Sequence, residues 1–242
     1  MRLALGSEAL PESDLEDLLD ASRRRGFAGV ELVAGGAHGI GPTEPLVFGA
    51  LRARHEEIVE DRAADAEAAT SAAGARLAGR LGAPVVSPAW RSKPGRLAKA
   101  ADHYAAAEGE LLLSVPPRIA EVEAVRAEIE ALDTGSIGIA LDVQPMRDDL
   151  SAIQTVLAAA GPRLRIVRLH GGGPEGAAQT GRGIGHLMAA LALNRYAEVV
   201  VLTPTGKATL RMWAAWLGRA GGWGCGSKAP LTVLTPPGQA YS

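Results

Sequence analysis

The sequence predicts an α/β protein in which eight parallel strands close into a single (β/α)8 TIM barrel. Short apolar segments alternate with helical segments along most of the 242 residues, and such alternation favours parallel strands joined by right-handed crossovers. Two apolar segments, 137–142 and 164–170, end on Asp142 and His170, at the strand ends where barrels of this kind keep their functional groups. An open doubly wound sheet is the alternative architecture.

The first third of the chain predicts three strands and one well-marked helix. Residues 2–6 are a short apolar run, and residues 11–14 (PESD) then supply the start of a helix over 15–25 with acids in its first turn. The apolar positions of this helix lie largely on one face. Residues 29–33 (GVELV) predict the second strand, and 46–53 (LVFGALRA), after a glycine-rich loop, predict the third.

The middle of the chain continues the alternation. Residues 58–81 are rich in Ala, Glu and Arg, which predicts one long helix that breaks near Gly74. Residues 84–87 are then predicted as a strand and 96–108 as a helix. Residues 110–114 are predicted as a strand stopped by two prolines, and 119–132 as a helix with apolar residues at helical spacing.

The last third supplies the strands that carry the two polar ends. Around them the pattern predicts a further strand over 198–202, and helices over 149–160, 184–193 and 209–219. Glycines at 171–173 and at 181 and 183 bracket a segment that we expect to be a flexible loop over the barrel mouth. We expect the barrel to occupy residues 1–220, and the apolar, Gly- and Pro-rich tail 221–242 to pack on the barrel or on a partner subunit.

Composition excludes several classes of function. The 25 basic and 27 acidic residues provide no concentrated cationic surface for nucleic acid, and no segment approaches the roughly 20 apolar residues of a membrane span. The single cysteine, Cys225, excludes an internal disulfide and a Cys-based zinc cluster. We therefore expect a cytoplasmic protein, and the cluster of Trp213, Trp216 and Trp223 beside an apolar tail predicts a homodimer.

Four segments carry a recognisable set of motifs: DLLDASRRRGFAGVELV, IGIALDV, IVRLH and TGRGIGHLMAALALNRYAEVVVLT. In order, they are similar to the first helix with the second strand, the sixth strand, the seventh strand, and the last helix with the eighth strand of the xylose isomerase-like barrels. That superfamily includes sugar isomerases and epimerases, inosose dehydratases and the family-two apurinic endonucleases. The resemblance covers most of residues 1–205 and implies the same barrel fold.

The resemblance also implies one divalent metal, held by Glu, Asp, His and Glu at the ends of the fifth to eighth strands. Asp142 and His170 match the Asp and the His, whereas Ser114 and Thr203 stand where the two Glu residues would be. Half of the ligand set is therefore missing. Binding of Mn, Mg or Zn by Asp142 and His170 is one expectation, and a site without metal is the other.

Two further charged residues, Glu31 and Arg168, lie near the ends of predicted strands. Glu31 follows a buried valine, and an unpaired buried carboxylate is costly, so it should face the barrel mouth or meet a cation. Arg168 shares a strand face with His170 and is the candidate cation; an inward ion pair and a substrate contact are both open. We assign Glu31 and Arg168 to catalysis. The predicted substrate-binding residues are His38, Ser114, Gln144, Arg182 and Thr203.

Together with the resemblance, these residues imply a sugar or polyol isomerase or epimerase that binds a carbohydrate-like ligand at the C-terminal face of the barrel. The alternative is a catalytically inactive relative that serves as a binding or scaffold protein, which the missing Glu ligands favour. Nuclease action is disfavoured, because the sequence lacks both the multi-histidine metal cluster and a basic face for DNA.

Overall fold

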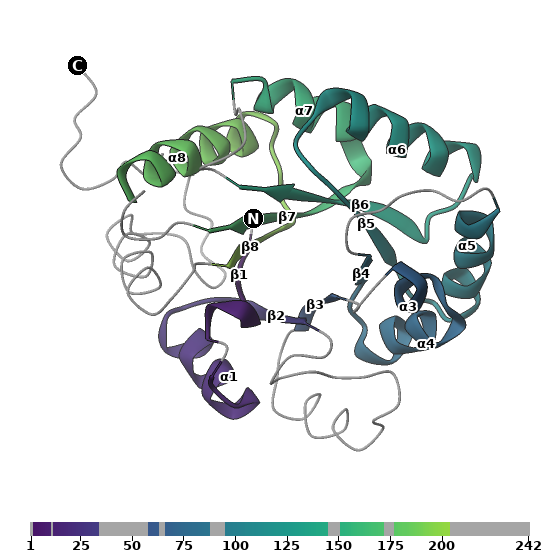
Figure 1. Ribbon diagram of the computed structural model, residues 1–242, viewed down its shortest axis with the longest axis horizontal. Helices are drawn as coiled ribbons and strands as arrows, with labels where there is room; N and C mark the ends of the chain where they lie inside the picture. Colours follow the sequence, from purple (N-terminus) through teal and green to yellow (C-terminus); the bar gives the residue numbers. More distant parts are fainter. Residues whose placement is uncertain are drawn as a thin grey trace.

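The structure is a computed structural model that describes residues 2–10, 12–33, 58–62, 66–87, 95–144, 151–171 and 177–203. Eight parallel strands pair in chain order, and β8 also pairs with β1, so the sheet closes into a barrel. Figure 1 shows the strands as an inner ring with the helices around it. The predicted closed barrel is confirmed, and the open sheet is wrong.

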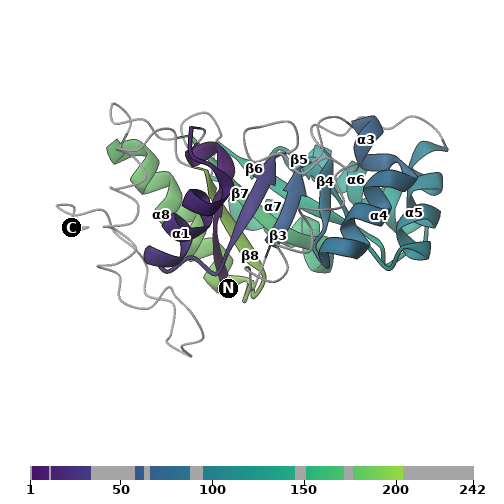
Figure 2. The same cartoon turned by 90° about the horizontal axis from the view of Figure 1, so that it is seen from below.

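The strands are β1 (Arg2–Gly6), β2 (Gly29–Val33), β3 (Ile58–Arg62), β4 (Val85–Ser87), β5 (Leu111–Val115), β6 (Ile137–Val143), β7 (Leu164–His170) and β8 (Val199–Thr203). The helices are α1 (Leu15–Arg24), α3 (Ala66–Thr70), α4 (Ala72–Leu81), α5 (Arg96–Ala106), α6 (Ile119–Ala131), α7 (Ile153–Ala160) and α8 (Ala177–Leu193). Figure 2 shows the same elements from below. Within the described ranges, no helix combines the length and the apolar character needed to cross a bilayer.

Helix α1 forms where its capping residues predict it. The Asp14 carboxylate accepts a hydrogen bond from the backbone N–H of Asp17 at 2.8 Å, which satisfies one of the free donors at the helix start. Leu18 and Leu19 are buried on the inner face of the helix. An amphipathic helix with its own cap therefore follows β1, as the sequence predicts.

The third strand differs from the prediction. β3 is formed by Ile58–Arg62, inside the segment predicted as a helix, and it pairs with both β2 and β4. Its first two residues are β-branched and favour a strand, whereas the alanines that predicted a helix follow later. The segment 46–53 lies outside the described residues, and the third place in the barrel belongs to β3.

The helix that follows β3 breaks at Ser71 and not at Gly74. The Ser71 hydroxyl accepts the backbone N–H of Gly74 at 3.1 Å and so caps the start of α4. Gly74 lies inside α4, where a side chain would come within 2.6 Å of the backbone oxygen of Ala68. The glycine therefore permits close packing of α3 on α4, while the serine restarts the helix.

Two later helices also differ from prediction in their bounds. α8 starts at Ala177, so the glycines at 181 and 183 lie within a helix and do not end a loop. α7 starts at Ile153, and residues 145–150 lie outside the described ranges. The predicted helix 209–219 and the tail 221–242, with the three tryptophans, also lie outside them.

The core has two layers, separated by the sheet. The larger layer lies between the outer face of the strands and the helices. The smaller layer lies inside the barrel; among the side chains that the structure describes it contains Ala4, Val86, Leu112, Ala140, Ile166, Val199 and Val201. Because successive residues of a strand point to opposite faces, these positions also show which later residues on each strand point into the barrel.

Candidate functional site

Polar side chains gather at the C-terminal ends of the strands, beyond the apolar cluster inside the barrel. Asp142, Arg168 and Thr203 each lie two residues after a member of that cluster, so strand alternation turns them inward. Glu31 enters the same space from β2, where its two neighbours pack outward against the helices. The site is thus built from the last inward positions of several strands.

A register shift places the two central residues opposite each other. Ile139 of β6 pairs with Leu164 of β7, and the irregularity that follows takes up one extra residue of β7. Asp142 therefore lies opposite Arg168. Without the shift it would lie opposite Val167, whose side chain belongs to the outer layer of the core. The shift brings a carboxylate and a guanidinium together inside the barrel.

Asp142 is the hub of the site. Its Oδ1 accepts a hydrogen bond from Nε of Arg168 at 2.6 Å and lies 3.3 Å from Nε2 of His170. Its Oδ2 accepts a hydrogen bond from the hydroxyl of Ser114. Since an ionised carboxylate can only accept, Nε2 of His170 is the donor in this contact. The predicted meeting of Asp142 and His170 at the barrel mouth is confirmed.

The surroundings of Asp142 keep it ionised. Burial of the carboxyl group raises its pKa, but the charge of Arg168 and the hydrogen bonds from His170 and Ser114 outweigh this, so the pKa lies well below its usual range. The side chain of Asp142 remains 21% exposed and that of His170 18% exposed. A permanent negative charge beside a reachable imidazole results.

Glu31 and Arg168 form a second contact deeper in the barrel. Both side chains have an exposed fraction of 0%, and Nη1 of Arg168 lies 3.9 Å from Oε2 of Glu31. Neither Glu31 oxygen has a hydrogen-bond partner in the part of the chain that the structure describes. Of the two alternatives open for Arg168, an inward ion pair or a substrate contact, the structure shows an ion pair with Glu31, and Arg168 joins the carboxylates of β2 and β6.

Thr203 and Gly6 complete the ring of strand ends, and the role of Gly6 is one that sequence reasoning missed. Thr203 pairs with His170 in the sheet, and Gly6 pairs with Glu31. A side chain at position 6 would collide with the Thr203 hydroxyl, so glycine makes room for that hydroxyl. The only sequence signal was a small residue at the end of the first apolar run.

The other predicted site residues are only partly placed. Gln144 directly follows β6 and is half-buried. Arg182 belongs to α8 and not to a loop, and nothing further is described of its side chain. His38 lies outside the described residues. Among the side chains that the structure describes, the site therefore draws on residues of β1, β2 and β5–β8.

The described residues do not fit a divalent metal ion as they stand. Within them, no group of three or more His, Cys, Asp or Glu side chains is placed to hold a metal. Both oxygens of Asp142 already accept hydrogen bonds, and the charge of Arg168 at one of them would repel a second cation. The metal-ligand roles predicted for Asp142 and His170 gain no support from this geometry.

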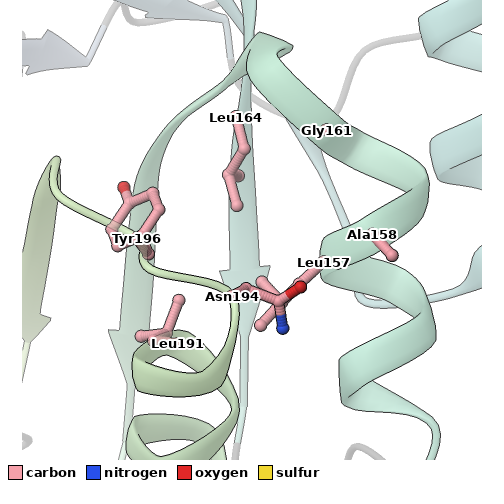
Figure 3. Close-up of a pocket in the computed structure, with 7 residues that line it drawn as sticks. All are labelled: Leu157, Ala158, Gly161, Leu164, Leu191, Asn194 and Tyr196. Carbon is pink, nitrogen blue, oxygen red and sulfur yellow. The ribbon is translucent and has the colours of Figure 1, made fainter.

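A separate cavity lies at the opposite end of the barrel. It has a volume of about 140 Å³ and lies between α7, α8 and the start of β7, lined by Leu157, Ala158, Gly161, Leu164, Leu191, Asn194 and Tyr196 (Figure 3). Leu164 is the first residue of β7 and His170 the last, so the length of the strand separates the cavity from the polar cluster. Its lining is mostly apolar and holds no acid or base.

Comparison with known proteins gives solved structures only, since no family model and no curated protein matches the chain. D-psicose 3-epimerase from Clostridium cellulolyticum H10, crystallised with D-tagatose, has a TM-score of 0.60 at 14% identity, covering 88% of this chain and 90% of the other. A family 2 AP endonuclease from Brucella melitensis has a TM-score of 0.66 at 13% identity, covering 90% and 98%. A probable 3-DHS dehydratase from Bacillus anthracis has a TM-score of 0.63 at 11% identity, covering 90% and 99%.

These likenesses confirm the predicted resemblance to the xylose isomerase-like barrels at the level of the fold. The three proteins are named for an epimerisation, a nuclease reaction and a dehydration. One barrel therefore carries several chemistries, and function has to be argued from the site residues.

Proposed function

We propose that this protein binds a small carbohydrate-like molecule at the C-terminal ends of the barrel strands and transfers a proton on it, as in isomerisation or epimerisation. The observation that carries the proposal is the partly exposed pair of Asp142 and His170, 3.3 Å apart. Sugar epimerases among the structures of the same fold support the carbohydrate class.

In the proposed reaction His170 is the general base. Its Nε2–H donates to Asp142, which fixes the orientation and the tautomer of the ring and leaves Nδ1 as the proton acceptor. A base in this position takes the proton from the carbon next to a carbonyl group; the C–H electron pair forms a C=C bond and the carbonyl π pair moves to oxygen, which gives an enediolate. Return of the proton from His170 to the neighbouring carbon gives the isomer after a proton moves between the two oxygens, and addition of a solvent proton to the opposite face of the original carbon gives the epimer.

Glu31 and Arg168 support this pair in the proposal and do not contact the ligand. Their side chains are completely buried, so they act by holding Asp142 ionised and in place. Ser114 has the same effect on the other carboxylate oxygen. The catalytic assignment of Glu31 and Arg168 thus becomes one of positioning, and His170 takes the role of the acid and base.

The second candidate is a binding protein without catalysis. The observation in its favour is that the ends of β5 and β8 carry the neutral hydroxyls of Ser114 and Thr203. Epimerisation that uses two faces of a substrate commonly needs two groups able to move protons. Among the residues the structure describes at this mouth, His170 is the one exposed base with a fixed orientation.

The two candidates differ in a measurement of hydrogen exchange. The full chain is incubated with D-fructose, D-psicose or D-tagatose in D2O, and deuterium incorporation beside the carbonyl is followed by NMR. We expect incorporation with at least one ketose, and a loss of about 100-fold or more in His170→Asn. His186→Asn, an exposed histidine on α8, is the matched control and should keep the wild-type rate. Ligand binding without exchange would favour the binding protein.

The homodimer stays a prediction, because the tryptophans that suggest it lie outside the described residues. The cytoplasmic location also stays a prediction. Light scattering after size-exclusion chromatography tests the dimer directly. A monomer at micromolar concentration would contradict it.

A further inference from the structure

We infer that the guanidinium group of Arg168 takes the place, inside this barrel, of the divalent cation that the resemblance implies. The site would then have a built-in cation and need no metal. This inference concerns charge and metal binding, and it holds whether or not proton transfer occurs.

The contacts of Arg168 are those of a central cation. Its side chain is completely buried, its Nε lies 2.6 Å from Asp142 Oδ1, and its Nη1 lies 3.9 Å from Glu31 Oε2. These carboxylates belong to β6 and β2, so the guanidinium joins strands that do not neighbour each other in the sheet. A metal ion at the centre of a ligand set makes the same kind of link.

The charges agree with this replacement. The ligand set of the resemblance, with three carboxylates and a divalent ion, carries a net charge of minus one when its histidine is neutral. Among the charged side chains that the structure describes in contact with each other here, Glu31, Asp142 and Arg168 sum to the same net charge. The change of both terminal Glu ligands to Ser114 and Thr203 is therefore consistent with a site that has a single positive charge to balance.

A guanidinium differs from a metal in what it offers a ligand. It has no open coordination position, and at 0% exposure it does not reach a bound molecule. Its effect passes through Asp142, which it keeps ionised and directed at His170. The positive charge of the site thus serves the histidine rather than the substrate.

The test is replacement of the cation. Wild-type protein, freed of metal by dialysis against EDTA, should show no change in Tm with about 1 mM Mn2+ or Zn2+. Arg168→Met removes the charge and leaves two carboxylates and His170 without a cation. In this variant we expect Mn2+ to raise Tm by about 5 °C, and the rise should be lost in Arg168→Met/Asp142→Asn.

Two matched controls are available on β7, one at position 168 and one at position 165. Arg168→Lys keeps the charge and should show no response to metal. Arg165 lies on the same strand, is 42% exposed and pairs with Glu110. The variant Arg165→Met should also show no change in Tm with metal.

Stoichiometric Mn2+ binding to the wild type that disappears in Asp142→Asn would overturn the inference, as would a folded Arg168→Met without a metal response. If Arg168→Met does not fold, Arg168→Gln removes the charge but keeps a side chain that can bond to Asp142. That variant retains both carboxylates and His170 and should give the same metal response, and its absence there counts against the inference.

Discussion

At the N-terminal end of the barrel, Tyr196 and Arg163 bond to backbone carbonyl groups and Arg165 forms an isolated pair with Glu110, whereas at the C-terminal end three side chains converge on one carboxylate. The Tyr196 hydroxyl donates to the carbonyl oxygens of Arg165 and Val199, each at 2.8 Å. Nη1 of Arg163 donates to the carbonyl oxygen of Thr134 at 2.6 Å. These contacts satisfy backbone acceptors where strands and helices begin, so they connect chain segments and leave no group directed at a ligand.

The C-terminal end has the opposite character. Asp142 holds Arg168, His170 and Ser114 by side chain alone, and two of these four side chains stay partly exposed. Barrels of this class place stability at the N-terminal face and chemistry at the C-terminal face. Polar side chains and ion pairs occur at both ends, so polarity does not by itself mark a site; the difference is that several side chains from different strands meet at Asp142.

The largest expected effect comes from breaking the buried charges. Arg168→Met leaves Glu31 and Asp142 facing each other without a cation, and we expect a loss of about 3–5 kcal/mol in the free energy of unfolding. Arg165→Met breaks a partly exposed pair with Glu110 and should cost about 1 kcal/mol or less. Urea unfolding measures both. Equal losses in the two variants would remove the distinction between the buried and the exposed pair.

A smaller effect is expected in acid. Because folding lowers the pKa of Asp142 from its ordinary value of 3.8, its ionised form stabilises the fold above about pH 4, and this contribution is lost as the pH falls further. Asp142→Asn should therefore flatten the decline of unfolding free energy between about pH 5 and pH 3. An unchanged slope would show that the carboxylate is not held in its charged form by folding.

The smallest effect is expected at the other end of the barrel. Tyr196→Phe removes the hydroxyl that bonds two carbonyl groups, and we expect a loss of about 1–2 kcal/mol in unfolding free energy. Deuterium exchange into a ketose and the response to Mn2+ should stay at wild-type levels. A change in either would mean that the two ends of the barrel are coupled and not separate.

Much of the site can be predicted from the sequence. The predictions that are wrong share a cause: local sequence signals are weak where packing of the whole barrel decides the structure. The charged strand ends Asp142 and His170 were predicted as neighbours because parallel strands bring their C-terminal ends to one edge. The strand Ile58–Arg62 was missed because five residues before a long Ala-rich segment carry little local signal. The glycines at 181 and 183 were placed in a loop because glycine disfavours helices, but α8 continues through them in the packed barrel.

The barrel architecture, the positions of the polar strand ends and the need of Glu31 for a cation can be predicted from local patterns, because side-chain alternation and the cost of a buried charge act over a few residues. Which of these groups meet depends on how the strands pack together. The extra residue of β7 after Leu164 puts Arg168 opposite Asp142, and closure of the sheet brings Glu31 to the same guanidinium. Register and closure depend on the packing of all eight strands, so no single segment contains them.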